Sequence, residues 1–265
     1  MNDYLVLNLG DLSVALILIA VTIALSVWQK LGLEGDLLVG TIRAFVQLMA
    51  MGYLLQGIFD VEKWYLVLLM LCVMIAFAAR TAYGRQAVKW RSLLWQLTLA
   101  IGGASLAILS VVVFLILKLH PPYQPRYVIP LAGMIIGNSM NGAALAVNRL
   151  TEEIESHRGQ IEVALALGAT SRQAVAPYLR QSLRAAMLPT IASMMTVGIV
   201  QLPGMMTGQI IAGARPEEAV RYQVMVAYMI TAATALTTVW ISSLTLGQFF
   251  TQAHQLEVNV NGNQA

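Results

Sequence analysis

The stretch Leu93–Leu117, LLWQLTLAIGGASLAILSVVVFLIL, decides the fold class because it carries no charged residue along its whole length. A helix needs about 20 consecutive apolar residues to cross the hydrocarbon core of a bilayer, and this stretch exceeds that length. The rest of the chain agrees, since 58% of its 265 residues are hydrophobic and only 11% are charged. A soluble domain has about 25% charged residues. The sequence therefore predicts an all-α protein that crosses a membrane several times.

Similar apolar blocks on both sides of this stretch predict about seven membrane spans. The chain has no basic residue before Lys30, so we expect the first block to be a retained span and not a cleaved signal peptide. We expect one transmembrane domain over residues 1–265, with a polar tail at 254–265. The expected spans are residues 9–27, 37–58, 64–79, 93–117, 127–147, 187–202 and 223–246.

Basic residues between the expected spans predict the orientation of the chain. If the N-terminus lies outside, ten basic residues fall in inside loops and five in outside loops. Cytoplasmic loops carry the excess of Lys and Arg, so we expect an outside N-terminus, a cytoplasmic C-terminus and a cytoplasmic 148–186 segment. The basic residues sit at the ends of spans, so the pI near 9.1 does not indicate a nucleic-acid partner.

Residues 148–186 form the one long polar stretch between apolar blocks. Apolar residues recur there at helical spacing, and Gly168 is placed to end a first helix in a left-handed conformation. Thr170 followed by Gln173 is a capping-box pattern that begins a second helix. Pro189 would then open the next span. The pattern predicts an amphipathic helical hairpin, which either contacts a soluble partner or only covers the end of the bundle.

Polar side chains inside the expected spans mark a candidate translocation route, because such groups face the bundle interior or a water-filled path. Hydrogen bonds between helices are the alternative role for the amides, and adaptable packing is the alternative for the methionines. The candidates are Asn138, Met140, Asn141, Gln201, Met205, Met206 and Gln209.

Glycines define two close-packing candidates and one helix break. Gly133 with Gly137, and Gly204 with Gly208, have the Gly-x-x-x-Gly spacing that lets two helix backbones approach closely in a membrane. Pro203 directly before Gly204 predicts an interruption, and interrupted spans are where transporters expose backbone to a cavity.

The sequence indicates neither an enzyme nor a defined metal site. It lacks the P-loop pattern Gly-x-x-x-x-Gly-Lys-Ser/Thr and the hydrolase motifs His-Glu-x-x-His and Gly-x-Ser-x-Gly, so we expect the chain to bind no cofactor of its own. No expected span holds a carboxylate–histidine cluster, so metal ligands stay unassigned. The histidines, all in expected loops or the tail, are His120, His157 and His254.

Three segments resemble known permeases. EVALALGAT at Glu162–Thr170, with a later Leu-Pro pair, resembles the coupling loop of ABC transporter permeases, although its Gly-to-Pro interval is longer than in importers. PLAGMIIGNSM at 130–140 and LPGMMTGQIIAG at 202–213 look like signature segments of the FetB permease family, and the resemblance covers nearly the whole chain. Bacterial members of that family are associated with iron export, and plant relatives with aluminium tolerance.

The resemblance implies a permease subunit of an ABC transporter in the cell membrane that exports iron or another metal. ATP and Mg²⁺ would then be bound by a separate ATPase subunit. Two copies of the chain are expected, because seven spans make half of an ABC membrane domain. The residues it implies for coupling to the ATPase are Glu162, Gly168, Ala169, Thr170 and Arg172.

Two other functions remain open on the residues. One is an ATP-independent secondary transporter or channel, which the lack of carboxylates in the expected span cores disfavours. The other is a membrane scaffold that recruits a soluble partner through the polar segment. The Pro203–Gly204 break and the intramembrane amides weigh against the scaffold.

Overall fold

The computed structural model describes residues 8–90, 92–251 and 255–256. These residues form helices and no strand, and five helices are long and apolar enough to cross a membrane, which confirms an all-α polytopic membrane protein. They divide into two compact units, residues 8–62 with Ile211–Gly213, and Lys63–Ile210 with residues from 214 onward. Each unit is described by itself. Most of the expected polar tail at 254–265 lies outside the described residues.

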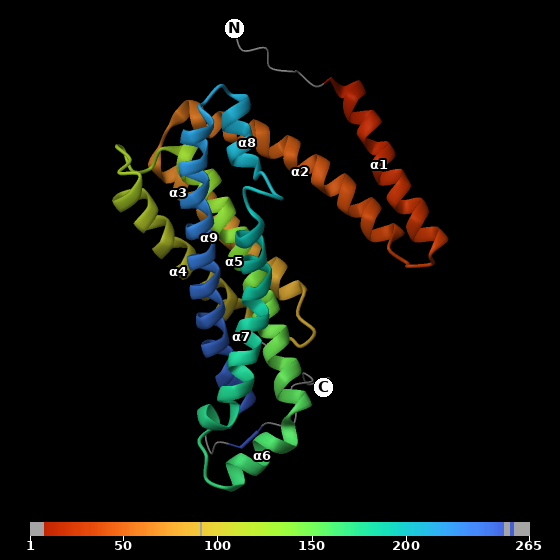
Figure 1. The fold of residues 1–265 in the computed structure, drawn as a ribbon, viewed down its shortest axis with the longest axis vertical. Helices are drawn as coiled ribbons and strands as arrows, with labels where there is room; N and C mark the ends of the chain where they lie inside the picture. Colours follow the sequence, from red (N-terminus) through yellow and green to blue (C-terminus); the bar gives the residue numbers. More distant parts are fainter. Residues whose placement is uncertain (1–7, 91, 252–254, 257–265) are drawn as a thin grey trace. The chain divides into compact units, whose positions relative to one another are not determined.

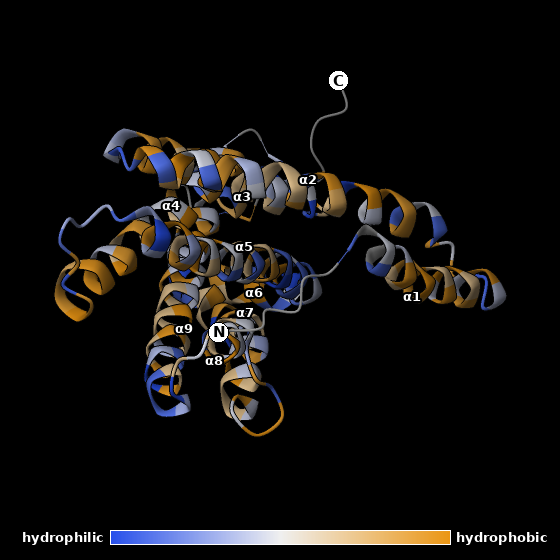
Figure 2. Ribbon diagram, turned by 90° about the horizontal axis from the view of Figure 1, so that it is seen from above, coloured by the Kyte–Doolittle hydropathy of each residue, from blue (hydrophilic) through white to orange (hydrophobic). Residues whose placement is uncertain are grey.

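The first unit contains α1 (Leu9–Trp28) and α2 (Glu34–Val61). Asn8 and Asp11 form a capping box at the start of α1. The Ser26 hydroxyl donates to Glu34 Oε1 at 3.0 Å, which ties the two helices across their short connection. Figure 2 shows apolar residues around both helices, and none of the most apolar 18 residues of α2 is buried. A helix that exposes apolar residues all round is suited to contact with lipid.

The second unit is a bundle arranged around α5, which packs against α3, α4, α7 and α9 (Figure 1). Its fully buried side chains come from several helices, with Leu131 and Ile135 on α5, Leu97 and Ile101 on α4, and Ile241 on α9. The elements are α3 (Trp64–Gly84), α4 (Leu93–Val111), a π-helical turn (Val112–Ile116), α5 (Pro125–Ser156), α6 (Arg158–Ala166), α7 (Ser171–Thr196), α8 (Gly204–Ile211), α9 (Pro216–Leu246) and a 3₁₀ turn (Gly247–Phe249).

Small residues let α5 and α9 approach closely. A Cβ added at Gly142 would lie 2.6 Å from Cγ2 of Thr234, so the close contact there depends on glycine. The facing side of α9 is a row of buried threonines and serines. Three of these hydroxyls donate to carbonyls of their own helix, Thr237 to Ala233, Thr238 to Ala235 and Thr245 to Ile241. Hydroxyls satisfied in this way pack like small apolar groups inside a membrane bundle.

The 148–186 segment differs from the expected pair of short helices. α5 continues without interruption past residue 147 to Ser156, and α7 begins at Ser171 and runs through Pro177 and Pro189 to Thr196. Pro189 therefore lies inside a helix and opens none. α5 and α7 continue into this segment because their apolar residues remain buried against each other. Leu150 and Ile154 of α5 lie in one cluster with residues of α7. The count of seven spans stays a prediction.

Candidate coupling helix and translocation cavity

The short helix α6 ends in a tight turn at Gly168. Gly168 has a φ of +92°, the left-handed region that favours glycine. Its N–H donates to the Leu165 carbonyl and the Ala169 N–H donates to the Ala164 carbonyl, both at 3.0 Å. This pair of bonds is the Schellman pattern, which satisfies carbonyls that a helix end leaves free. The left-handed helix end predicted at Gly168 is present.

The next helix begins two residues later with a capping box. The Gln173 N–H donates to Thr170 Oγ1 at 3.4 Å, and the Thr170 N–H donates to Gln173 Oε1 at 2.9 Å. Each side chain satisfies a backbone group at the start of α7. The capping box predicted from the sequence is therefore formed. Every backbone N–H from Leu167 to Thr170 therefore donates a hydrogen bond.

The inner face of α6 is anchored to α5 and α7. Ile161 is fully buried in a cluster with Ile154, Val175 and Phe249. The Tyr178 hydroxyl donates to Gln160 Oε1 at 2.6 Å, which adds a polar bond between α7 and α6. Because both apolar and polar contacts join these elements, α6 is held as one body with the ends of its two neighbours.

The outer face of α6 is exposed and partly apolar. Val163 is 60% exposed and Leu167 is 84% exposed, one turn apart on the same face. Glu162 lies beside them and accepts from Arg158 Nε at 2.9 Å. Of the predicted coupling residues, four are exposed and Ala169 is half-buried. The sequence prediction missed Val163 and Leu167, although their four-residue spacing, out of phase with Ile161 and Leu165, signals an outer face.

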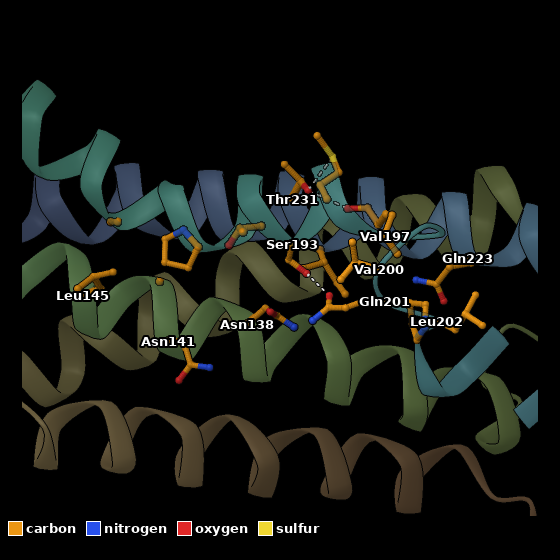
Figure 3. A pocket seen from close by; sticks show the side chains of 18 residues that line it. Asn138, Asn141, Leu145, Ser193, Val197, Val200, Gln201, Leu202, Gln223 and Thr231 are labelled. Carbon is orange, nitrogen blue, oxygen red and sulfur yellow. Dashed lines mark hydrogen bonds between the residues drawn. The ribbon is translucent and has the colours of Figure 1, made fainter. Parts of the chain in front are cut away.

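A cavity of about 710 Å³ lies between α5, α7, α9 and the turn that joins α7 to α8 (Figure 3). Three predicted route residues, Asn138, Asn141 and Gln201, line it together. The structure does not place Gln209, Met140, Met205 or Met206 in the lining. Sequence reasoning missed four polar lining residues, of which Gln223 lies at the very start of an expected span. These are Thr190, Ser193, Gln223 and Thr231.

The amides of the cavity differ in which polar atom they leave for a solute. Asn138 donates its Nδ2 to the Met134 carbonyl at 2.8 Å, so its oxygen remains. Asn141 accepts from Arg85 at 2.8 Å through Oδ1, and Figure 3 shows this side chain pointing from α5 away from the other lining side chains. Gln201 accepts from Ser193 at 3.4 Å, a contact drawn in Figure 3. Gln223 is only 9% exposed, and its Oε1 has no hydrogen-bond partner.

The helix is interrupted beside the cavity, where α7 ends at Thr196 and α8 begins at Gly204. Gly198 has a φ of +90°, and its N–H donates to the Gln201 carbonyl at 2.8 Å, which closes a tight turn. Pro203 lies at the end of this turn and lines the cavity. The helix therefore ends seven residues before the expected break at Pro203–Gly204, and most residues of the 197–203 interruption line the cavity.

The Gly-x-x-x-Gly candidates differ in their surroundings. A Cβ added at Gly133 would lie 3.3 Å from Met74 Cε, so this glycine faces α3. Added atoms at Gly137, Gly204 and Gly208 would meet nothing within 4 Å. Close packing by these three glycines stays a prediction, whereas Gly142 makes a close contact that the sequence pattern did not single out.

The described part of the chain contains no group of three or more His, Cys, Asp or Glu side chains that could hold a metal ion. The polar atoms of the cavity lining are amides and hydroxyls, with the thioether of Met194 beside them. Iron is usually held by carboxylate, imidazole or thiolate ligands. The described cavity can therefore hydrogen-bond a solute, but it lacks the usual ligands of a bare iron ion.

Residues 9–250 match the family described as "Uncharacterised protein family (UPF0014)". The chain belongs to this family. UPF0014 membrane protein slr1647 of Synechocystis is 41% identical over 95% of this chain and 97% of its own length. The probable iron export permease protein FetB of Escherichia coli is 39% identical, over 97% and 98%. ALUMINUM SENSITIVE 3 of Arabidopsis thaliana is 36% identical, over 93% and 89%. No solved structure matches significantly.

These relatives confirm the resemblance to the FetB permease family that the sequence segments indicated. Members of UPF0014 are named as membrane proteins, and one is named as a permease. Together with the five long apolar helices, this makes the chain a multi-pass membrane protein of a transport family.

Proposed function

We propose that this chain is the membrane subunit of an ABC transporter that exports iron or another metal from the cell. ATP and Mg²⁺ would bind a separate ATPase subunit, and two copies of the chain would pair around a common axis. The metal comes from the names of relatives, the FetB iron export permease above all. In this arrangement the N-terminus faces outside and the C-terminus and α6 face the cytoplasm.

The observation that carries the proposal is the exposed outer face of α6. This helix joins two long helices, is fixed to both, and presents Val163, Leu167 and the Arg158–Glu162 pair outward. An apolar pair rimmed by charged residues is suited to docking in a groove of a soluble protein. Because Glu162–Thr170 resembles an ABC coupling loop, we infer that this soluble protein is the ATPase.

The route through the membrane would be the cavity between α5, α7 and α9. α5 and α7 line the cavity and also hold α6 at their ends, so a movement of α6 reaches the cavity walls through continuous helix. ATP binding and hydrolysis in the partner would shift the equilibrium between conformations of these helices, and the cavity would open to alternate sides.

Co-purification tests the proposal directly. The tagged chain is extracted from its native host in mild detergent, and the proteins bound to it are identified by mass spectrometry. We expect a stoichiometric P-loop ATPase. Leu167→Asp should abolish its retention, because Leu167 is 84% exposed and a charge there disturbs the docking face without disturbing the core.

A charge reversal supplies a matched control. Arg172→Glu should weaken retention of the ATPase, whereas Arg180→Glu should not, because both arginines are exposed on α7 but Arg180 lies about 12 Å further along the helix from the Gly168 turn. If no ATPase binds under several mild conditions, or if Leu167→Asp retains it fully, the coupling assignment fails.

A further inference from the structure

Three long helices line the cavity, and the chain joins α6 to only two of them. α5 ends at Ser156, one residue before α6, and α7 begins at Ser171, after the turn that closes α6. α9 reaches the same end of the bundle from a distant part of the sequence (Figure 1). A displacement of α6 can therefore reach α9 only through non-covalent contacts.

Phe249 supplies such a contact at the end of α9. It lies in the 3₁₀ turn that follows α9, and among the described residues it is the largest side chain that is fully buried. It belongs to the same apolar cluster as Ile161 of α6 and Val175 of α7. The next residue, Phe250, forms a bridge with Leu256, and both pack against this cluster. The end of α9 is therefore anchored beside α6.

Trp90 fixes the position of the Phe249 ring. The two rings meet edge to face, with centroids 5.8 Å apart and planes 74° apart, a geometry that aromatic pairs favour. The Trp90 indole N–H donates to Gln96 Oε1 at 3.1 Å, and Gln96 Nε2 donates to the Leu244 carbonyl of α9 at 3.2 Å. These contacts hold Phe249 and the last turn of α9 together as one body.

The length of α9 is suited to carry a displacement from Phe249 to the cavity. After its first residue, Pro216, α9 contains neither proline nor glycine, whereas α7 contains Pro177 and Pro189. Sharp kinks in helices arise mainly at proline, so α9 bends less easily than α7. Ala227 of α9 lines the cavity about 33 Å from Phe249 along the helix.

We propose that Phe249 is a positioning residue that carries a displacement of α6 into α9. When the ATPase displaces α6, the buried cluster around Ile161 displaces Phe249, and α9 moves together with it. Packed side chains and rigid helices that have two arrangements are the elements that couple distant sites. All three long helices of the cavity then respond to one docking site. This inference rests on the proposed function, because it assigns the contact through which the ATPase moves α9.

Cysteine labelling in the complex with the ATPase tests the inference without knowledge of the solute. The exposed native cysteine is removed as Cys72→Ala, and one reporter cysteine is added to the cavity lining, either Ala227→Cys on α9 or Ser193→Cys on α7. Labelling by N-ethylmaleimide in nanodiscs is followed by mass spectrometry, without nucleotide and with ATP plus vanadate. We expect the trapped nucleotide to change the labelling rate of both reporters.

Phe249→Ala should abolish the nucleotide response of the α9 reporter and preserve that of the α7 reporter, because the chain still joins α7 to α6. Phe249→Leu keeps an apolar contact and should retain part of the α9 response. Ile241→Ala is the control for stability, since Ile241 is also fully buried on α9 but lies outside the cluster. It should lower the melting temperature to a similar extent and leave both responses intact.

The outcomes separate this inference from the proposed function. If no ATPase binds the wild-type chain, the proposed function fails and the inference fails with it. If the ATPase binds but the α9 reporter ignores nucleotide in the wild type, or responds equally in Phe249→Ala, the proposed function stands and the role of Phe249 is rejected. Equal loss at both reporters, or loss in Ile241→Ala as well, indicates a general structural defect and also rejects that role.

Discussion

The imidazole of His157 stacks on the ring of Tyr178, with centroids 4.4 Å apart and planes 24° apart. His157 is the single residue between α5 and α6, and Tyr178 lies two turns into α7. The stack therefore joins three helices at one point. Beside it, Gln181 donates to Glu153 Oε1 at 2.9 Å, which adds a second bond between α5 and α7.

Tyr178→Ala should loosen α6 without unfolding the bundle. It removes the stacking contact and the bond to Gln160, together worth about 1–3 kcal/mol. Amide hydrogen exchange in α6 should rise at least about tenfold. Tyr178→Phe keeps the stack and should show a smaller increase. Tyr228→Ala, at a tyrosine 65% exposed on α9, is the control and should leave α6 exchange unchanged.

Gly168→Val should uncouple ATP hydrolysis from transport. The site has open space around it, so the cost is backbone strain, about 1–2 kcal/mol for a residue with a Cβ in the left-handed region. The strain would disturb the turn that sets the angle between α6 and α7. Gly168→Asn should stay coupled, because asparagine tolerates this conformation. Transport per ATP hydrolysed in proteoliposomes is the measurement, and equal coupling in both variants would contradict the assigned role.

Gly142→Ala should destabilise the bundle by about 1–3 kcal/mol, because the new Cβ would lie 2.6 Å from Cγ2 of Thr234. Thermal unfolding in detergent measures the change. Gly137→Ala on the same helix meets nothing within 4 Å and should be neutral or slightly stabilising. Adding Thr234→Ser to Gly142→Ala removes the nearest methyl group and should restore part of the stability. A melting temperature for Gly142→Ala equal to that of Gly137→Ala would refute the close contact.

Gln223→Leu should separate transport from stability. Its buried Oε1 has no partner, so removing it loses no hydrogen bond and relieves a burial penalty of about 1–3 kcal/mol. The melting temperature should hold or rise, while export falls because a polar group of the cavity is lost. Ser242→Ala is the matched control, since Ser242 is buried on the same helix with an unpartnered hydroxyl but does not line the cavity. Export should be unchanged in Ser242→Ala.

Helix ends could be predicted from the sequence where residues within one turn of each other determine them. Gly168 and the Thr170–Gln173 pair act within a few residues, so the left-handed helix end and the capping box were both identified. The helix break is local only at its end, where Pro203 and Gly204 are adjacent, since α7 already ends at Thr196.

Helix boundaries near the polar segment could not be predicted, because hydropathy reports the surroundings of a helix and not its continuity. Arg149 and Glu152 lower the local hydropathy at the expected end of a span, but α5 continues through them because Leu150 and Ile154 stay buried. Pro189 was expected at the start of a helix and lies within α7, where membrane helices tolerate proline.

The cavity required long-range information. Asn138, Asn141 and Gln201 could be selected because they are polar residues inside apolar blocks. Gln223 lies at the edge of an expected span and Ser193 carries only a small hydroxyl. Only the packing of α9 and α7 against α5 shows that both reach the same space. The bond between Arg85 and Asn141 joins residues 56 positions apart, which no local pattern predicts.

The length of α7 connects α6 to the cavity through a single helix. From Ser171 beside α6 to Ser193 at the cavity, the helix runs about 33 Å. Its first residues are held by the turn at the end of α6, so a rotation there displaces the residues at the cavity. Tilting such a rod by about 10° moves its far end by roughly 6 Å, enough to open or close a passage for a small solute. A small displacement of α6 by the partner would thus produce a larger displacement of α7 at the cavity.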